Sequence, residues 1–293
     1  MTVTYEIYVV SSSILSLLLE ISPYWITGLV LGSLVSVYFS EKIADKVNSL
    51  GAGKLGGVLS IGIASMLGVI SPLCMYGTIP VIVAFGRKGV PQHILAAFMI
   101  SSVLLNPNLF VLGFVLGTHI ALARFGLALL CGILAGIIVL FFFEKCQLFR
   151  LDHFSLKEKG KKQFFADLLK AFRITAPYLL LGIIITALFN RYIPPHWISA
   201  MFGARRGVGV LFATSLSIPL YACGGGIIPL IRTWLFAGMG YGDALAFMIA
   251  GPATKITNLF AVKMILGVKN FMLYLAYVIG FAVAVGLLVE FII

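Results

Sequence analysis

Charged residues are scarce in this chain. They make up 11% of its 293 residues, whereas a soluble domain carries about 25%. Hydrophobic residues account for 61%. A composition so poor in charge excludes an ordinary water-soluble globular protein and indicates a protein that lies in a lipid bilayer.

Acidic residues are the scarcest of the charged ones, with 10 Asp and Glu against 21 Lys and Arg and a net charge of +11. The basic residues concentrate in short loops and in the hydrophilic stretch Glu144–Arg173. Lys and Arg accumulate in cytoplasmic loops, so this stretch is expected in the cytoplasm. A basic run can also bind acidic lipid headgroups. The charge therefore indicates topology and a bilayer partner, and no nucleic-acid partner is expected.

Cysteine and enzyme motifs are sparse as well. The four cysteines, Cys74, Cys131, Cys146 and Cys223, form no disulfide framework. The sequence contains no Gly-x-Ser-x-Gly, His-Glu-x-x-His or phosphate-loop motif, and its four His residues have no metal-ligand spacing. We expect no catalytic residue, no metal site and no cofactor, and hence no nucleotide-driven pump.

Long apolar runs are what the sequence has instead, and a bilayer span needs about 20 such residues. The expected spans are Tyr24–Phe39, Pro91–Asn106, Ile120–Phe143, Tyr178–Phe189 and Phe271–Leu288. Two preceding segments, Tyr5–Ile21 and Phe164–Ile174, are predicted to be interfacial helices. The predicted fold class is an all-α polytopic membrane protein.

The chain also repeats itself. Pro, Gly, Tyr and a Phe-Met pair recur in the same order over roughly 80 residues, which chance among Leu-rich segments does not readily produce. The matched positions are Pro23, Tyr24 and Gly28 with Pro177, Tyr178 and Gly182, Pro72 with Pro219, Pro80 with Pro229, Gly89 with Gly238, and Ala96–Ile100 with Leu245–Ile249. In this alignment the second half has two extra residues between its prolines. The domains are expected to be a first transmembrane repeat at 1–143, a basic cytoplasmic connector at 144–163 and a second repeat at 164–293.

Each repeat contains a proline-bounded segment, Pro72–Pro80 and Pro219–Pro229. Proline removes a backbone donor and interrupts a helix, and broken helices at matching positions mark the substrate site of many transporters. The alternative interpretation is a pair of simple proline kinks. The loop charges favour an odd number of crossings before the connector, so the second repeat is predicted to be inverted and the two broken-helix hairpins to meet near the midplane. Arg191, Arg205 and Arg206, which this topology places outside, oppose it.

Thiols lie beside both breaks. Cys74 is followed by Tyr76 in the first half, and Tyr221 precedes Cys223 in the second. Thiolates are soft ligands suited to thiophilic ions, although cysteine is also common as a small buried residue. Both interpretations stay open, and these four residues are candidate substrate ligands.

Polar residues follow each hairpin: Asn106 in the first half, and Thr254, Lys255 and Asn258 in the second. Lys255 aligns with Asn106. A charge inside the bilayer is a functional candidate by default, while the alternative is a side chain that snorkels to the interface. Lys255 would suit an anion or a sulfur-containing acid.

The sequence resembles the predicted-permease family that includes the organoarsenical efflux permeases. The matching stretches cover nearly the whole chain and are Ser71–Cys74 with Gly77 and Pro80, Asn106-Pro107, Pro219–Cys223 and Ala250–Thr254. The resemblance implies a permease and, for characterised members, efflux of trivalent methyl- or aryl-arsenicals with cysteine involvement. Two positions depart from the family pattern. Met75 and Tyr76 stand where the family often has Ser-Cys, and Lys255 stands where it usually has Asn.

We therefore predict an inner-membrane permease, multi-pass and open to oligomer formation, for a small soft or thiophilic solute, with a trivalent organoarsenical as the candidate cargo and arsenic resistance as the phenotype. One alternative is a permease for a sulfur-containing or other small anion. A second is a membrane-embedded lipid-phosphate enzyme, for which only Arg232 offers a suitable side chain near a hairpin.

Overall fold

The computed structural model describes residues 2–34, 54–71, 73, 75–143, 147–150, 207–221, 227–236 and 238–292, with scattered helical residues between 169 and 191. Every regular element in these residues is a helix, which agrees with the predicted all-α class. The helices are α1 (Thr2–Leu34), α3 (Lys54–Ile70), α4 (Met75–Arg87), α5 (Gln92–Leu104), α6 (Pro107–Gly113), the 3₁₀ helix η2 (Phe114–Leu116), α7 (Thr118–Phe142), α10 (Val208–Leu220), α11 (Ile227–Phe236), α12 (Tyr241–Thr254) and α13 (Ile256–Ile292).

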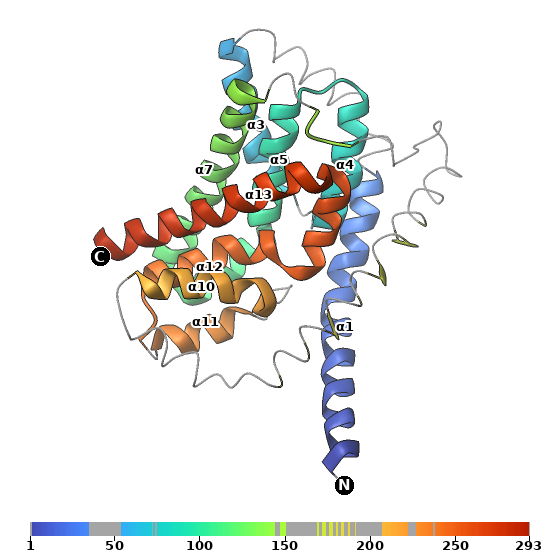
Figure 1. Cartoon of the computed structure of the whole chain (residues 1–293), viewed down its shortest axis with the longest axis vertical. Helices are drawn as coiled ribbons and strands as arrows, with labels where there is room; N and C mark the ends of the chain where they lie inside the picture. Colours follow the sequence, from blue (N-terminus) through green and yellow to red (C-terminus); the bar gives the residue numbers. More distant parts are fainter. Residues whose placement is uncertain are drawn as a thin grey trace.

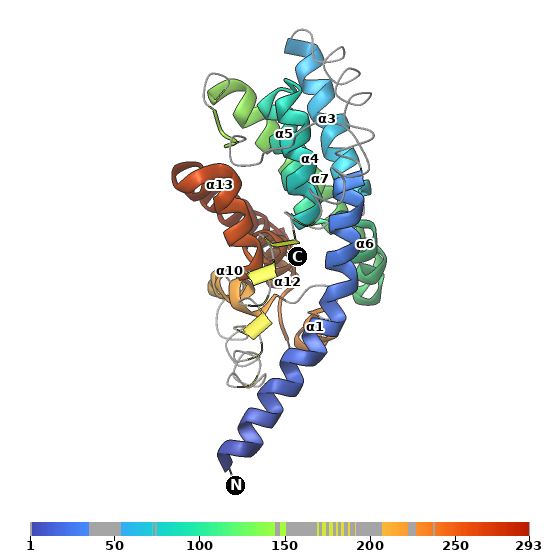
Figure 2. The same ribbon diagram turned by 90° about the vertical axis from the view of Figure 1, so that its right-hand side faces the viewer.

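The first helix, α1, is continuous through Pro23. The predicted boundary between an interfacial helix ending at Ile21 and a span beginning at Tyr24 is therefore wrong. A proline inside a helix removes one backbone hydrogen bond and crowds the preceding turn, but here apolar sequence on both sides continues the helix. Figure 2 shows α1 as a long rod that runs alongside the other helices. Near its start, the carboxylate of Glu6 forms an ion pair with Arg191 Nη2 at 2.7 Å.

Three helices of the first half, α3, α5 and α7, pack on one another (Figure 1). Glycines allow the close approach. A Cβ added at Gly136 of α7 would lie 2.6 Å from Ile61 Cγ2 of α3 and 3.1 Å from Ala97 Cβ of α5. Small residues at helix contacts are typical of membrane bundles, where close backbone packing rather than the hydrophobic effect holds helices together.

Three helices of the second half, α10, α12 and α13, form a second group of the same kind. A Cβ added at Gly286 of α13 would lie 2.6 Å from Val210 Cγ1 of α10 and 2.9 Å from Ala246 Cβ of α12. In Figure 1, α10, α11 and α12 occupy the lower part of the molecule and α3, α4 and α5 the upper part, with α13 crossing between them.

Two described helices are long and apolar enough to cross a membrane, Thr118–Phe142 and Asn258–Ile292. A third results if the bent pair Gln92–Leu104 and Leu109–Leu116, which meet at 49°, is counted as one span. These helices cover the predicted spans Ile120–Phe143 and Phe271–Leu288 and have the length and composition that a span requires. The predicted span Tyr178–Phe189 and segment Phe164–Ile174 lie largely outside the described residues.

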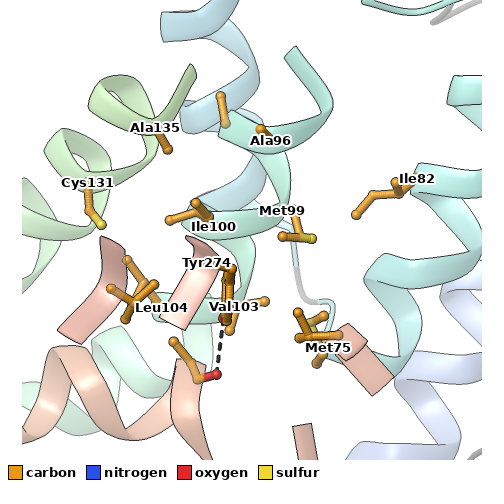
Figure 3. Packing of buried hydrophobic residues seen from close by; sticks show 14 of the residues in the cluster. Met75, Ile82, Ala96, Met99, Ile100, Val103, Leu104, Cys131, Ala135 and Tyr274 are labelled. Carbon is orange, nitrogen blue, oxygen red and sulfur yellow. Dashed lines mark hydrogen bonds between the residues drawn. The ribbon is translucent and has the colours of Figure 1, made fainter. Parts of the chain in front are cut away.

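The larger of the two buried clusters joins both halves. Met75 of α4, Met99 and Val103 of α5, Cys131 of α7 and Tyr274 of α13 belong to it (Figure 3). The Tyr274 hydroxyl donates to the backbone carbonyl of Ala253 at 3.0 Å. The core therefore connects the end of α12 to the first-half helices α4, α5 and α7.

The described part of the basic connector, residues 147–150, packs against the helices. Leu148 and Phe149 are buried, and the Arg150 N–H donates to the carbonyl of Ile265 at 2.7 Å. The Leu148 N–H donates to Gln92 Oε1 at 2.6 Å. Within this hydrophilic connector, Leu148 and Phe149 are packed and not solvated, because they are apolar side chains that gain by leaving water.

Candidate functional site

Both halves have a break where the proline-bounded segments were predicted. α3 ends at Ile70 and α4 begins at Met75, while α10 ends at Leu220 and α11 begins at Ile227. Pro80 and Pro219 do not bound the breaks, contrary to prediction, because Pro80 lies inside α4 and Pro219 inside α10. Pro72 lies outside the described residues. Each proline costs its helix one hydrogen bond, which a helix packed among others tolerates.

A second break follows α5. Leu105 and Asn106 are extended, and α6 starts immediately afterwards with Pro107 in its first turn. The Asn106 side-chain oxygen accepts from the Leu109 N–H at 2.9 Å. Such a cap satisfies one of the free donors at a helix start. The structure thus places Asn106 at a break, where its side-chain oxygen serves as a helix cap.

In the second half, a break falls at Lys255, between α12 and α13. Its side chain is buried at 3% exposure, so it lies among the packed helices and not at the surface. Thr254 Oγ1 donates to the Ala250 carbonyl at 2.8 Å, and Asn258 Nδ2 donates to the Pro252 carbonyl at 2.7 Å. Proline and the break leave carbonyls without helical partners, and such groups must be satisfied locally inside a membrane.

Tyr221, which follows α10, packs against α12 just before this break. Its ring is 2% exposed and sits against Gly251, where an added Cβ would clash with ring atom Cδ2. The ring also contacts Phe247, at 6.2 Å between centroids. Only glycine at position 251 leaves room for the ring, so Tyr221 packs directly on the last turn of α12.

The Tyr221 hydroxyl accepts a hydrogen bond from Arg124 Nη2 of α7 at 3.1 Å. Sequence reasoning missed Arg124, because the basic residues were assigned to loops. Its side chain is 2% exposed, and its Nε and Nη1 atoms have no hydrogen-bond partner in the part of the chain that the structure describes. Arg124 lies in the second turn of α7, a helix long and apolar enough to cross a membrane. The available signal was a lone arginine inside the apolar run Thr118–Phe142.

The structure describes only part of the candidate thiol site. Cys74 and Cys223 lie outside the described residues, and Tyr76 is in the first turn of α4 without a described side chain. Cys131, the cysteine with a described side chain, is fully buried in the core between helices. The described side chains contain no group of three His, Cys, Asp or Glu residues able to hold a metal ion.

The carboxylates of Asp243 and Glu290 lie near each other at the N-terminal end of α12. Asp243 is 3% exposed, and its Oδ2 accepts from the Gly240 N–H at 3.3 Å. The Glu290 carboxylate lies against Gly240, where an added Cβ would be 2.5 Å from its Oε2. Asp243 also faces Gly209, with Oδ2 2.6 Å from an added Cβ there. These two carboxylates form an acidic corner at the start of α12. The Tyr221 ring lies at the other end of the helix, and the helix end with this ring is called the Tyr221 break below.

Comparisons with known proteins agree with a transport function. Residues 7–291 match the sequence profile of the ArsP_1 family, described as a predicted permease. The chain is 25% identical to UPF0718 protein YcgR of Bacillus subtilis over 96% of each chain. It is 27% identical to a putative two-component membrane permease complex subunit of Streptococcus mutans, over 85% of this chain and 84% of the relative. It is also 26% identical to UPF0718 protein YraQ of Escherichia coli, over 89% and 75%.

No solved structure matches this chain. The profile match spans nearly every residue, including both helix breaks and the buried cluster around Tyr221. With its apolar membrane-length helices, this protein is a membrane permease and belongs to the predicted-permease family ArsP_1.

Proposed function

We propose that this protein is a secondary transporter of the inner membrane, built from two inverted repeats, that moves a small soft or thiophilic solute through a site between its helix breaks. A trivalent organoarsenical is the candidate cargo, with efflux as the direction. The observation that carries the proposal is the set of buried polar groups at the break after α12, where Tyr221, Thr254 and Lys255 are each at most 3% exposed. Interrupted helices with polar groups inside a membrane bundle are typical of transporter substrate sites.

Matching packing supports the two repeats. Gly136 contacts Ile61 and Ala97, and Gly286 contacts the corresponding Val210 and Ala246. Left-handed glycines also recur. Gly89 and Gly238 follow α4 and α11, with φ of 78° and 100°.

A second pair of left-handed glycines falls later in each half. Gly117 immediately precedes α7, and Gly267 interrupts α13, with φ of 120° and 71°. The piece of α13 after Gly267 therefore corresponds to α7, and the piece before it corresponds to α6 and η2. A residue other than glycine is strained at such φ values, so these positions are structural markers of the repeat.

The packing also changes the expected alignment. Ile61 and Val210 have the same separation along the chain as Cys74 and Cys223, and as Pro80 and Pro229. The two-residue insertion is then unnecessary, and Pro72 pairs with Tyr221 instead of Pro219. In this alignment the two thiols occupy equivalent positions. An inverted arrangement would bring them to one cavity from opposite sides of the membrane.

The thiol proposal is tested by drug resistance. Cells lacking their own arsenic exporters would express the wild-type chain or a variant and be grown with phenylarsine oxide, arsenite or Hg²⁺. We expect the wild type to raise resistance to phenylarsine oxide. Cys74→Ser and Cys223→Ser should each abolish that gain at normal expression, because a hydroxyl is a poor ligand for a soft ion.

Cys131→Ala is the matched control, since Cys131 lies in the core of a plain helix. It should keep most of the resistance. If the three variants behave alike, the thiols are packing residues and the soft-solute proposal fails.

The lipid-phosphate enzyme has less support. Arg232, the arginine it requires near a hairpin, is exposed on α11 and lies over the Phe236 ring, with 5.7 Å from Cζ to the ring centroid. An arginine on the surface of a helix, held by its neighbour one turn away, is not part of the buried Tyr221 break. The family match likewise favours a transporter over an enzyme.

A further inference from the structure

Arg124 is buried with most of its donors unused. One of its N–H groups reaches the Tyr221 hydroxyl, while Nε and Nη1 have no hydrogen-bond partner among the residues that the structure describes. Buried polar groups in proteins are almost always hydrogen-bonded. An arginine retained for structure would be expected to have its fork filled by a carboxylate or by backbone carbonyls. The unused donors of Arg124 therefore call for a ligand.

The described carboxylates of the second half do not fill this role. Asp243 and Glu290 meet at the start of α12, whereas the Tyr221 ring sits on Gly251 near its end. Asp243 and Gly251 are eight residues apart, which is about 12 Å along a helix axis. The guanidinium thus lies at the Tyr221 break, away from this acidic corner.

The position of Arg124 connects the two halves at the candidate site. It extends from α7, the long span of the first half, to Tyr221, which follows α10 of the second half. Cys223 is two residues beyond Tyr221 in sequence. A group bound by the guanidinium would therefore lie next to the helix break that follows α10.

We propose that Arg124, positioned by Tyr221, is an anion-binding residue of the transport site, and that the soft solute it carries also bears a carboxylate or oxyanion group. The inference rests on the proposed transport function and names the charge of its cargo. A guanidinium presents planar paired donors that match the oxygens of such groups. At 2% exposure the side chain is closed off from solvent, so the cargo reaches it when the helices around the break move apart, as alternating access requires.

Thermal unfolding of the purified full-length protein with three matched probes tests this proposal. The probes are mercaptoacetate, with a thiol and a carboxylate, acetate, with the carboxylate alone, and 2-mercaptoethanol, with the thiol alone, all at fixed ionic strength. A ligand that binds the folded state raises the unfolding midpoint as its concentration increases. We expect mercaptoacetate and acetate to raise the midpoint of the wild type and 2-mercaptoethanol to leave it unchanged.

Arg124→Gln should lower the apparent affinity for the two anions by roughly tenfold or more, because charge-assisted hydrogen bonds are the strong ones. Arg124→Lys keeps the positive charge but lacks the paired donors of the guanidinium, so its affinity for the anions should fall less than that of Arg124→Gln. Tyr221→Phe removes the hydroxyl that orients the guanidinium and should fall between the wild type and Arg124→Gln. Arg232→Gln, on the exposed face of α11, is the matched control and should bind like the wild type.

The ligand-free midpoint separates binding from a structural role. Removing a buried charge with unused donors should leave the midpoint of Arg124→Gln equal to or above that of the wild type. A large fall in that midpoint, or anion shifts that are absent in the wild type or unchanged in Arg124→Gln, would overturn the proposal.

Resistance and transport assays distinguish failure of the anion site from failure of the proposed transport function. If phenylarsine oxide resistance depends on the thiols and is unaffected by Arg124→Gln, the transporter stands and the anion site falls. If anions bind through Arg124 but no probe is transported in vesicles, the anion site stands and the transport function fails.

Discussion

The two halves share a packing scheme and differ in their charges. In each, a glycine on the last long helix lets two other helices approach closely: Gly136 in the first half and Gly286 in the second. The break after α5 has Asn106, whereas the break after α12 has Lys255. The two halves therefore have similar glycine contacts between helices and differ in the polar residues at their breaks.

Two further differences follow the same pattern. Arg124 of α7 and Tyr274 of α13 have the same separation along the chain as Gly136 and Gly286, and both are buried. Ser102 of α5 likewise corresponds to Gly251 of α12. The Ser102 hydroxyl lies 2.9 Å from Thr78 Oγ1 and 3.3 Å from Ser71 Oγ. Gly251 instead packs against the Tyr221 ring, so the surroundings of Ser102 are polar and those of Gly251 are aromatic.

Topology gives the largest expected contrast between the halves. In an inverted arrangement, a Cys introduced at Arg205 faces the outside and one at Lys159 in the basic connector faces the cytoplasm. A membrane-impermeant thiol reagent applied to intact cells should label the first and not the second, measured against the parent chain. Permeabilised cells provide the control, since both sites should then react. Equal labelling of the two in intact cells, or labelling of Lys159→Cys alone, would eliminate the inverted arrangement.

The second-largest contrast is expected between substitutions of Gly251 and Ser102. Gly251→Ala places a methyl group on the Tyr221 ring, which must move and withdraw its hydroxyl from Arg124. We expect transport to fall by roughly tenfold or more, since overpacking of this kind costs about 1–3 kcal/mol. Ser102→Ala at the corresponding position removes a hydroxyl without adding volume and should reduce transport by less than about threefold. Uptake or efflux by vesicles measures both, and equal losses would show that the two breaks contribute alike.

The smallest contrast is expected in stability. Gly136→Ala and Gly286→Ala each push a Cβ to 2.6 Å from a branched side chain, Ile61 in one case and Val210 in the other. Both should destabilise by about 1–3 kcal/mol, and by similar amounts if the halves are true repeats. Gly126→Ala is the control, because nothing lies within 4 Å of a Cβ there. Thermal unfolding in detergent measures the three, and a large difference between the first two would contradict the repeat.

Much of the scaffold could be predicted from sequence, because apolar length and helix breakers act locally. The spans around α7 and the end of α13 follow from uninterrupted apolar runs. The breaks near Cys74 and Cys223 follow from proline and glycine. Pro23 shows the limit of such reasoning: it lies in the middle of α1, because one lost hydrogen bond is small beside the rest of a long helix.

Less of the candidate site could be predicted. Lys255 was recognised, because a charge in apolar sequence is conspicuous, and the structure places it at a buried break. Arg124 was not, although it is equally conspicuous within α7. Its partner Tyr221 is 97 residues away along the chain, and no local pattern reports a contact over that distance.

By itself, the sequence determined the class of the protein, its longest spans and the positions of its breaks, since each of these depends on the hydropathy and backbone chemistry of neighbouring residues. Tertiary structure alone decided which helices meet at Gly136 and Gly286, that the Tyr221 ring rests on Gly251, and that Arg124 reaches this ring. These contacts depend on side-chain volume and direction in three dimensions, which a linear pattern of apolar and polar residues does not specify.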